Sequence, residues 1–281
     1  MKQNFYTALK KAKPLQIVGV INAYCAILAE ESGHKALYLS GAGVANASYG
    51  LPDLGVTTLD DVLIDARRIT SASELPLLVD IDTGWDNIGE TIKAMESAGV
   101  AGIHMEDQVA QKRCGHRPNK ALVSKEEMGK RIKQAVTAKS DDSFMIMARC
   151  DALANEGLSS VIERSSYYAA CGADAIFAEA MTELSHYQQI KDALRVPLLA
   201  NITEFGKTDL YTTKQLASAG VDMALYPLSA FRAMSKAALD VYQTLLKEGS
   251  QSSVIGSMQT REKLYEYLDY HKFEQEVDRK K

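Results

Sequence analysis

Short apolar segments alternate with amphipathic segments along most of the chain, and this alternation constrains the fold more than any other feature. Eight segments are rich in Leu, Ile, Val and Ala, which is typical of strands buried on both faces of a parallel sheet. They lie at residues 15–20, 36–41, 75–82, 101–107, 144–151, 175–180, 197–203 and 221–227. Most of them precede a segment of helical character, and small-residue turns such as SAGV and CGAD lead from a helix back into a strand.

Eight such units within about 230 residues predict an α/β protein with a closed (β/α)8 TIM barrel. An open doubly wound sheet would need about six strands and usually a phosphate-binding first turn. The sequence GAGVANASYG after the second strand lacks the third glycine of a dinucleotide-binding loop, and it opens no clear helix. We therefore predict a single barrel domain over residues 1–281, with residues 249–281 as a C-terminal helical extension.

The composition is that of an ordinary globular protein, and it excludes several classes. Charged residues make up 24% and apolar residues 46% of the chain, which argues against wholesale disorder. The formal charge of −4 gives no basic surface for nucleic acid, and no segment approaches the ~20 apolar residues of a membrane span. The four cysteines have no CxxC spacing and we identify no secretory leader, so we expect free thiols and a cytoplasmic location. From the charge and the hydropathy we expect no nucleic-acid or membrane partner.

Carboxylates gather at the ends of the predicted strands, where a barrel carries its reactive groups. Asp80 and Asp82 are two residues apart on a strand, so both are expected to point to the same face. Two like charges there favour a bound cation, and oxygen ligands favour Mg²⁺ or Mn²⁺. Glu106 and Asp53 would complete an acidic ring, partly through water. A solvated aspartate pair is the alternative, and the five histidines show no spacing typical of zinc.

The stretch KRCGHR, directly after the fourth strand, sets a thiol among basic side chains. Cys114 is preceded by Lys112 and Arg113 and followed by Gly115 and His116. Positive neighbours lower the pKa of a thiol, so we predict proton exchange by Cys114 near neutral pH. The same cations suit a small polycarboxylate substrate. The alternative is a mobile basic loop whose cysteine is incidental.

Three later strand ends also carry polar residues. Arg149 ends an apolar strand and needs an anion, for which a substrate carboxylate and Glu179 are the candidates. Asn201 and Thr203 are two residues apart and could donate hydrogen bonds to the same ligand, although each could equally be satisfied within the protein. The remaining cysteines lie in apolar or helical surroundings and are predicted to pack: Cys25, Cys150 and Cys171.

Several motifs together resemble those of the isocitrate lyase/phosphoenolpyruvate mutase superfamily, over about residues 15–265. The motifs are GLPDLG, TTLDDV, LLVDIDTG, HMEDQ, KRCGHRPNK, MARCDA, LANITEFG, LYPLSAFRAM and MQTR. The KRCGH element is specific to the carbon–carbon lyase branch, because the mutase and hydrolase members lack the cysteine. The short chain separates it from the longer isocitrate lyases.

The resemblance implies a Mg²⁺-dependent lyase that cleaves 2-methylisocitrate to pyruvate and succinate in the methylcitrate cycle of propionate breakdown. It implies Mg²⁺ at Asp80 and Asp82, with Asp53 and Glu106 in the water-mediated shell. Cys114 would be the general acid, and Tyr38 would take part in removing the substrate's hydroxyl proton. The positions that match substrate contacts are Ser40, Gly41, Ala42, Gly115, Arg149, Glu179, Asn201, Ile202, Thr203 and Arg232.

The resemblance also implies a loop at residues 110–123 that closes over the site, and a homotetramer whose dimers exchange C-terminal helices. Three stretches depart from the family pattern, and all lie at the pocket rim: RCDA at 149–152, FAEA at 177–180 and WDNIGE after Gly84. These departures leave the substrate open to 2,3-dimethylmalate, isocitrate or oxaloacetate. A barrel that has lost catalysis and acts as a binding protein is the alternative from a different class.

Overall fold

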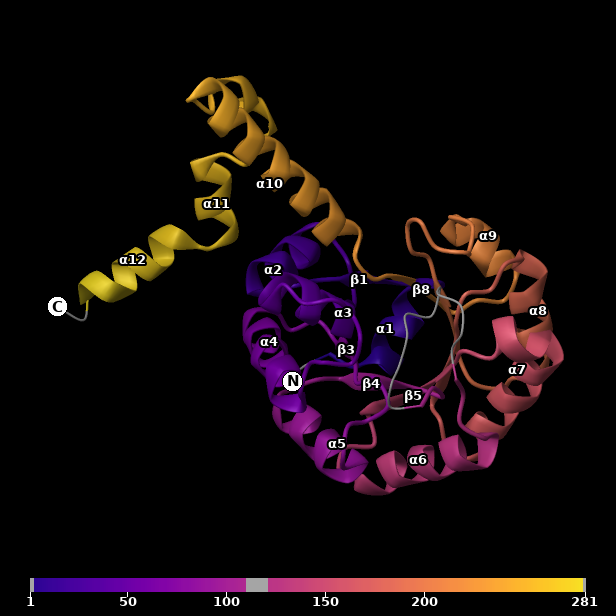
Figure 1. Ribbon diagram of the computed structural model, residues 1–281. Helices are drawn as coiled ribbons and strands as arrows, with labels where there is room; N and C mark the ends of the chain where they lie inside the picture. Colours follow the sequence, from indigo (N-terminus) through magenta and orange to yellow (C-terminus); the bar gives the residue numbers. More distant parts are fainter. Residues whose placement is uncertain (1–2, 110–120, 280–281) are drawn as a thin grey trace. The chain divides into compact units, whose positions relative to one another are not determined.

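The computed structural model describes residues 3–109 and 121–279. Eight parallel strands form a closed barrel in chain order, with β1 paired to β8, and helices surround it (Figure 1). This confirms the predicted (β/α)8 architecture. The strands are β1 Leu15–Gly19, β2 Leu37–Leu39, β3 Leu77–Asp80, β4 Gly102–Glu106, β5 Met145–Cys150, β6 Ala175–Ala178, β7 Leu198–Asn201 and β8 Met223–Tyr226.

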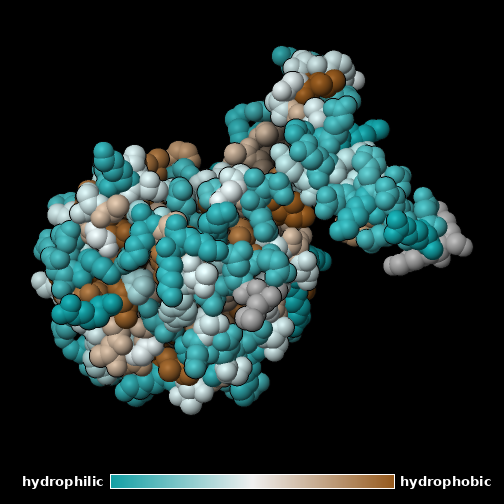
Figure 2. All heavy atoms as spheres, turned by 180° about the vertical axis from the view of Figure 1, so that it is seen from behind, coloured by the Kyte–Doolittle hydropathy of each residue, from teal (hydrophilic) through white to brown (hydrophobic). Residues whose placement is uncertain are grey.

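Most of the helices around the barrel begin at an N-cap side chain that accepts a backbone hydrogen bond. Thr58 and Thr212 each form a complete capping box with the residue three positions later, which satisfies amides that the first helical turn leaves without partners. The helices of the barrel are α1 Phe5–Lys11, α2 Ala23–Glu31, α4 Leu59–Ala72, α5 Ile88–Ser97, α6 Lys125–Ala138, α7 Leu153–Ala170, α8 Leu184–Ala193 and α9 Thr213–Ser218. The barrel face in Figure 2 is mostly hydrophilic, with scattered apolar residues.

The segment after β2 differs from the prediction that no clear helix opens there. It forms α3, Gly41–Gly43, and continues as a π-helical turn, η1, Val44–Ser48. Gly43 packs closely, because a methyl group there would lie 3.3 Å from the side chain of Leu228, which would have to shift. The small residues that weaken helix propensity are therefore the ones that fit this helix against the mouth of the barrel.

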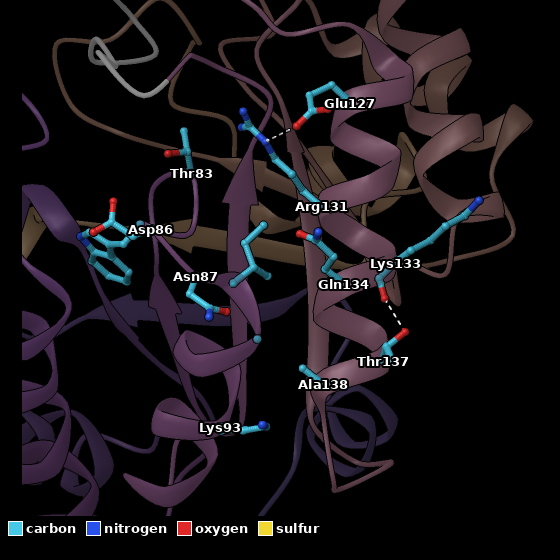
Figure 3. A pocket seen from close by; sticks show the side chains of 13 residues that line it. Thr83, Asp86, Asn87, Lys93, Glu127, Arg131, Lys133, Gln134, Thr137 and Ala138 are labelled. Atoms are coloured by element: carbon cyan, nitrogen blue, oxygen red, sulfur yellow. Dashed lines mark hydrogen bonds and ion pairs between the residues drawn. The ribbon is translucent and has the colours of Figure 1, made fainter.

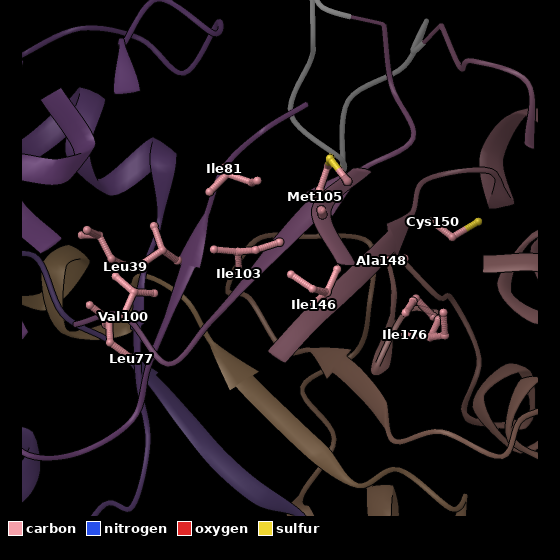
Figure 4. Packing of buried hydrophobic residues seen from close by; sticks show 14 of the residues in the cluster. Leu39, Leu77, Ile81, Val100, Ile103, Met105, Ile146, Ala148, Cys150 and Ile176 are labelled. Carbon is pink, nitrogen blue, oxygen red and sulfur yellow. The ribbon is translucent and has the colours of Figure 1, made fainter. Parts of the chain in front are cut away.

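Strand residues alternate between two cores. Side chains inside the barrel form one cluster, which includes Leu15, Leu78 and Phe177. The other cluster lies between the strands and the helices, and Figure 4 shows Ile103, Ile146 and other members of it. The three described cysteines are free and buried in this outer layer, which confirms their predicted packing role.

The C-terminal residues form a second compact unit, residues 230–281, separate from residues 1–229. The C-terminal helices predicted from the sequence are present: α10 Ser229–Glu248, η2 Ser252–Ser257, α11 Arg261–Tyr267 and α12 Tyr270–Arg279. None of these four helices contains a buried residue. The description of residues 1–281 as one domain stays a prediction. Within the described ranges, no helix is long and apolar enough to cross a membrane.

Candidate functional site

The alternation of strand residues places one polar side chain inside the barrel at the carboxyl end of six strands. In β4, for example, Ile103 and Met105 face the helices, so His104 and Glu106 face the interior. In the other five strands, every second side chain also faces the interior, and the last inward side chain at the strand end is polar. These polar residues are Ser40, Asp80, Glu106, Arg149, Glu179 and Asn201. The predicted gathering of polar groups at one end of the barrel is thus built by the strands themselves.

Two carboxylates converge beside Gly41. A methyl group on Gly41 would lie 3.2 Å from Asp80 Oδ2 and 3.3 Å from Asp82 Oδ1, so both oxygens face the same small volume. The Gly41 amide donates to Asp80 Oδ2 at 3.2 Å, and the Asp82 amide donates to Asp80 Oδ1 at 3.1 Å. The prediction that both aspartates lie on one strand was wrong. The strand ends at Asp80, and Asp82 adopts a left-handed φ of 51°. A turn after the strand therefore directs the Asp82 carboxylate toward Gly41.

The remaining members of the predicted acidic ring lie on neighbouring elements. Glu106, which is 1% exposed, ends β4, and its amide donates to the Asp82 carbonyl at 2.9 Å. Asp53 is half-buried in the loop that leads to α4. Among the described residues, no three carboxylate, imidazole or thiol groups lie close enough together to hold a metal ion alone. The carboxylate oxygens of Asp80 and Asp82 are of the type that a hard divalent cation binds, with water or substrate oxygens completing its ligands.

Arg149 lies among three carboxylates. Its Nε is 2.9 Å from Asp151 Oδ2 and 3.7 Å from Glu179 Oε2, and its Nη1 is 3.4 Å from Glu106 Oε2. Burial opposes the charged form, but these carboxylates outweigh it and raise the pKa of Arg149 well above its ordinary value. The guanidinium is therefore charged, and it lies over the ring of Phe177. Of the two anions left open by the sequence, Glu179 is in contact with it.

Buried charged groups gather at this end of the barrel. Six of them are carboxylates: Asp80, Asp82, Glu106, Asp107, Asp151 and Glu179. Two guanidinium groups lie among them, since Arg149 pairs with Glu106, Asp151 and Glu179, and Arg164 pairs with Asp107. Carboxylate oxygens are the ligands that a hard divalent cation prefers.

Tyr38 and His104 form a buried pair next to Asp80. Tyr38 Oη is 2.9 Å from His104 Nε2, which is 3.7 Å from Asp80 Oδ1. Burial raises the pKa of Tyr38 well above its ordinary value, and the Asp80 charge adds to the rise, so the phenol holds its proton in this arrangement. His104 is not among the site residues predicted from the sequence. Its position between Gly102 and Glu106, on the inward face of β4, was the available signal.

The other predicted substrate contacts divide into two groups. Asn201 Nδ2 donates to Glu179 Oε2 at 3.2 Å, so it joins the Arg149 cluster. Ile202 packs its side chain in the outer apolar core and leaves only backbone atoms for a ligand. Thr203 is buried at the end of the same segment. Ser40 is the N-cap residue of α3 and Ala42 is half-buried within that helix.

Some predicted residues lie outside the described part of the chain. They are Lys112, Arg113, Cys114, Gly115 and His116, together with most of the predicted closing loop 110–123. The described residues on either side are paired, since Gln108 forms an antiparallel bridge with Leu122. Arg232 belongs to the second unit, in α10.

Trp85 connects two loops that carry predicted metal carboxylates. Its indole Nε1 donates to the Thr57 carbonyl at 2.9 Å. Thr57 follows Asp53 in the loop before α4, and Trp85 follows Asp82 in the loop after β3. Trp85 adopts a left-handed φ of 52°, so this loop holds a conformation that a bulky residue seldom adopts. No local sequence pattern predicts this contact, because Thr57 and Trp85 are 28 residues apart.

A groove outside the barrel lies between α5 and α6 and has a volume of about 890 Å³ (Figure 3). Asn87, Lys93, Arg131 and Gln134 line it, and Arg131 forms an ion pair with Glu127. None of the predicted site residues that the structure describes lines this groove. The candidate site is therefore the carboxyl end of the barrel, where the buried charges gather.

Comparison with known proteins shows the chain's relatives. The family model described as phosphoenolpyruvate phosphomutase matches residues 5–246. A protein from Shewanella oneidensis named 2-methylisocitrate lyase is 62% identical over 277 residues, which are 98% of this chain and 95% of that protein. A protein of the same name from Escherichia coli is 60% identical over 278 residues, covering 98% of this chain and 94% of the relative.

Solved structures share the whole fold at lower identity. An oxaloacetate acetylhydrolase in complex with 3,3-difluorooxalacetate has a TM-score of 0.90 at 30% identity and covers 98% of this chain and 95% of its own. A 2,3-dimethylmalate lyase has a TM-score of 0.88 at 29% identity, covering 98% and 93%. A phosphonopyruvate hydrolase in complex with oxalate and Mg²⁺ has a TM-score of 0.83 at 26% identity, covering 95% and 94%. The fold, the site and these matches together show that the chain belongs to the phosphoenolpyruvate phosphomutase family.

Proposed function

We propose that this chain is a Mg²⁺-dependent lyase that cleaves 2-methylisocitrate to pyruvate and succinate, a step of propionate breakdown by the methylcitrate cycle. The observation that carries the proposal is the identity of 62% and 60%, over 98% of the chain, to proteins named 2-methylisocitrate lyase. The buried carboxylates and the charged Arg149 supply a site of suitable chemistry for an anionic substrate and a cation.

Asp80 and Asp82 would hold the metal ion, and Asp53 and Glu106 would act through water. The support is the convergence of two carboxylate oxygens beside Gly41 and the burial of Glu106 at the end of the neighbouring strand. Mg²⁺ accepts such a partial oxygen set because it keeps several waters. Mn²⁺ would fit the same ligands. When bound, the metal would stabilise negative charge on the substrate oxygen that becomes the pyruvate carbonyl.

The chain's own residues would then move two protons. Tyr38 Oη would accept the substrate's hydroxyl proton, and His104 Nε2, 2.9 Å away, is placed to take the phenol's own proton. The electron pair of the broken carbon–carbon bond would pass to the succinate carbon next to the carboxylate. Cys114 would protonate that carbon, with Lys112, Arg113 and His116 lowering the pKa of its thiol.

Substrate carboxylates would be held by the remaining predicted contacts. Arg149 is charged and held among carboxylates, so a substrate anion would complete its set of hydrogen-bond acceptors. Asn201 would share its amide between Glu179 and the ligand. The other proposed contacts are Ser40, Gly41, Ala42, Gly115, Glu179, Ile202, Thr203 and Arg232.

A substrate panel tests the proposal. Purified protein with Mg²⁺ receives 2-methylisocitrate, isocitrate, 2,3-dimethylmalate or oxaloacetate, and formation of the 2-oxo acid or loss of oxaloacetate is followed. We expect pyruvate from 2-methylisocitrate and loss of activity in EDTA. Turnover of another acid without turnover of 2-methylisocitrate would replace the proposed substrate. No turnover of any acid would favour the non-catalytic alternative.

The general acid is tested by a pair of cysteine variants. Cys114→Ser is expected to lose at least about 100-fold in kcat, because a hydroxyl is a far weaker acid than a thiol. Cys171→Ser is the matched control, since Cys171 is a buried free thiol after α7. Full activity of Cys114→Ser would remove the proposed acid.

The assembly is proposed to be a homotetramer in which C-terminal helices are exchanged, with residues 1–281 acting as one domain. The support lies in the second unit, where large apolar side chains are exposed: Tyr242 is 69%, Leu246 is 91% and Phe273 is 62% exposed. Apolar surface of this kind marks an association surface. Light scattering on the full chain is expected to give four times the chain mass, and a monomer would refute the assembly. The cytoplasmic location predicted from free thiols is kept as part of the proposal.

A further inference from the structure

A second buried guanidinium lies behind Arg149 and reaches it through two aspartates. We propose that Arg164 is a positioning residue that, held by Glu156 and Tyr168, fixes the Arg149 guanidinium through Asp107 and Asp151. The inference rests on the proposed function, because it assigns Arg149 a ligand to bind.

Arg164 bonds to four different groups. Its Nε and Nη2 donate to the two oxygens of Glu156, both at 2.7 Å, in the bidentate geometry that is strongest for a guanidinium and a carboxylate. Its Nη1 donates to Tyr168 Oη at 3.1 Å and to the Val123 carbonyl at 3.0 Å, and it lies 3.4 Å from Asp107 Oδ2. With 8% of its surface exposed, Arg164 is fixed in one orientation.

Asp107 connects Arg164 to the residue that follows β5, Asp151. It is fully buried, and its Oδ2 accepts from Tyr168 Oη at 2.7 Å. Its Oδ1 accepts from the backbone amide of Asp151 at 2.8 Å. The Asp151 carboxylate in turn accepts from Arg149 Nε at 2.9 Å and Nη2 at 3.2 Å. A continuous path of hydrogen bonds therefore runs from Glu156 to the Arg149 side chain.

The arrangement serves positioning better than stability. Buried ion pairs add little net stability, because the lost hydration of both charges offsets their attraction. The path instead joins segments that would otherwise be placed independently. Glu156 precedes Gly157, where a φ of 78° breaks the helix, and Val123 lies at the entrance to α6. Because these segments are held against Asp107, the backbone of Asp151 is restricted to one position. The Asp151 carboxylate then holds the Arg149 guanidinium in one orientation.

A double-mutant cycle tests the path. Glu156→Gln keeps the shape of the side chain but removes the charge that holds Arg164. Glu163→Gln is the matched control, because Glu163 lies on the same helix and forms an ion pair with Lys125, away from Arg164. Both substitutions are made in the wild-type chain and in Arg149→Lys. The value of kcat/KM is measured, together with hydrogen exchange at the Asp151 amide in the resting protein.

We expect Glu156→Gln to lower kcat/KM about 10-fold in the wild-type chain and less than about 2-fold in Arg149→Lys, because the loss acts through Arg149. Exchange at the Asp151 amide should become about 5-fold faster, and Glu163→Gln should change neither quantity. An equal loss in both backgrounds, or unchanged exchange at Asp151, would overturn the inference. A wild-type protein inactive on every acid would instead refute the proposed function, and the exchange measurement would then decide the positioning claim alone.

Discussion

Replacing Asp82 with asparagine is expected to stabilise the metal-free protein and to remove most of its stabilisation by Mg²⁺. One oxygen of Asp80 and one of Asp82 lie within 3.3 Å of the same point beside Gly41, so they are at most about 6.6 Å apart. With an effective dielectric constant of about 20, two unit charges no farther apart than this repel by at least about 2.5 kcal/mol. Asparagine tolerates the left-handed φ of 51°, so the change removes mainly the charge.

The assay is thermal unfolding followed by circular dichroism, in EDTA and in excess Mg²⁺. In EDTA, about 2.5 kcal/mol corresponds to a melting temperature about 5 °C higher for Asp82→Asn. At a Mg²⁺ concentration of about 100 times Kd, the wild-type protein should gain about 2.7 kcal/mol, and the variant less than about a fifth of that. Asp142→Asn, which changes an exposed carboxylate before β5, should match the wild type throughout.

Two results would refute this reasoning. If Asp82→Asn melted below the wild type in EDTA, the two carboxylates would not repel each other as the geometry requires. If Mg²⁺ stabilised the variant as much as the wild type, the metal would bind elsewhere.

Three further substitutions probe other parts of the barrel. Gly41→Ala places a methyl group beside both aspartates, so the Mg²⁺ concentration for half-maximal activity should rise at least about 10-fold, while the melting temperature in EDTA changes by less than about 2 °C. Burial, with the charge of Asp151 adding to it, raises the pKa of Asp107, so its contribution to stability is full below about pH 3.9 and declines as pH rises through the folded value. In denaturant unfolding, the free energy of unfolding of Asp107→Asn should therefore increase relative to that of the wild type from pH 4 to pH 7. A difference between the two proteins that does not change with pH would contradict the raised pKa. Asp222→Asn removes the negative charge that pairs with Lys191 Nζ at 2.7 Å and leaves one acceptor oxygen in place of two. This should lower the unfolding free energy by about 1–3 kcal/mol and leave KM unchanged, and a changed KM would refute the purely structural role.

The sequence predicted the barrel because fully buried parallel strands have a distinctive composition. Each predicted strand contains an observed one, but the predicted ends run too far, as in 75–82 against Leu77–Asp80. The polar residues that mark a predicted strand end, such as Asp82 and Thr203, lie two residues beyond the observed ends at Asp80 and Asn201. Strand ends depend on turn geometry, which a hydrophobic pattern does not contain.

The candidate site was predicted where local spacing carries the information and missed where distant segments meet. The polar residues at strand ends follow from the period of two along each strand. Arg164 meets Asp107 across 57 positions of the sequence, and no local pattern joins them. His104 was missed because an inward residue one layer below the strand end looks like core. The predictions for residues 112–116 rest on the sequence.

The indole that joins the two acidic loops has a practical consequence, since Trp85 is the only tryptophan in the chain. Its Nε1 is hydrogen bonded to the Thr57 carbonyl, and it lies three residues after Asp82. Indole emission depends on hydrogen bonding and on nearby charge, so binding at the carboxylates should change its intensity or wavelength. The unmodified protein thus carries its own optical reporter, placed between the two loops whose spacing a bound cation would set.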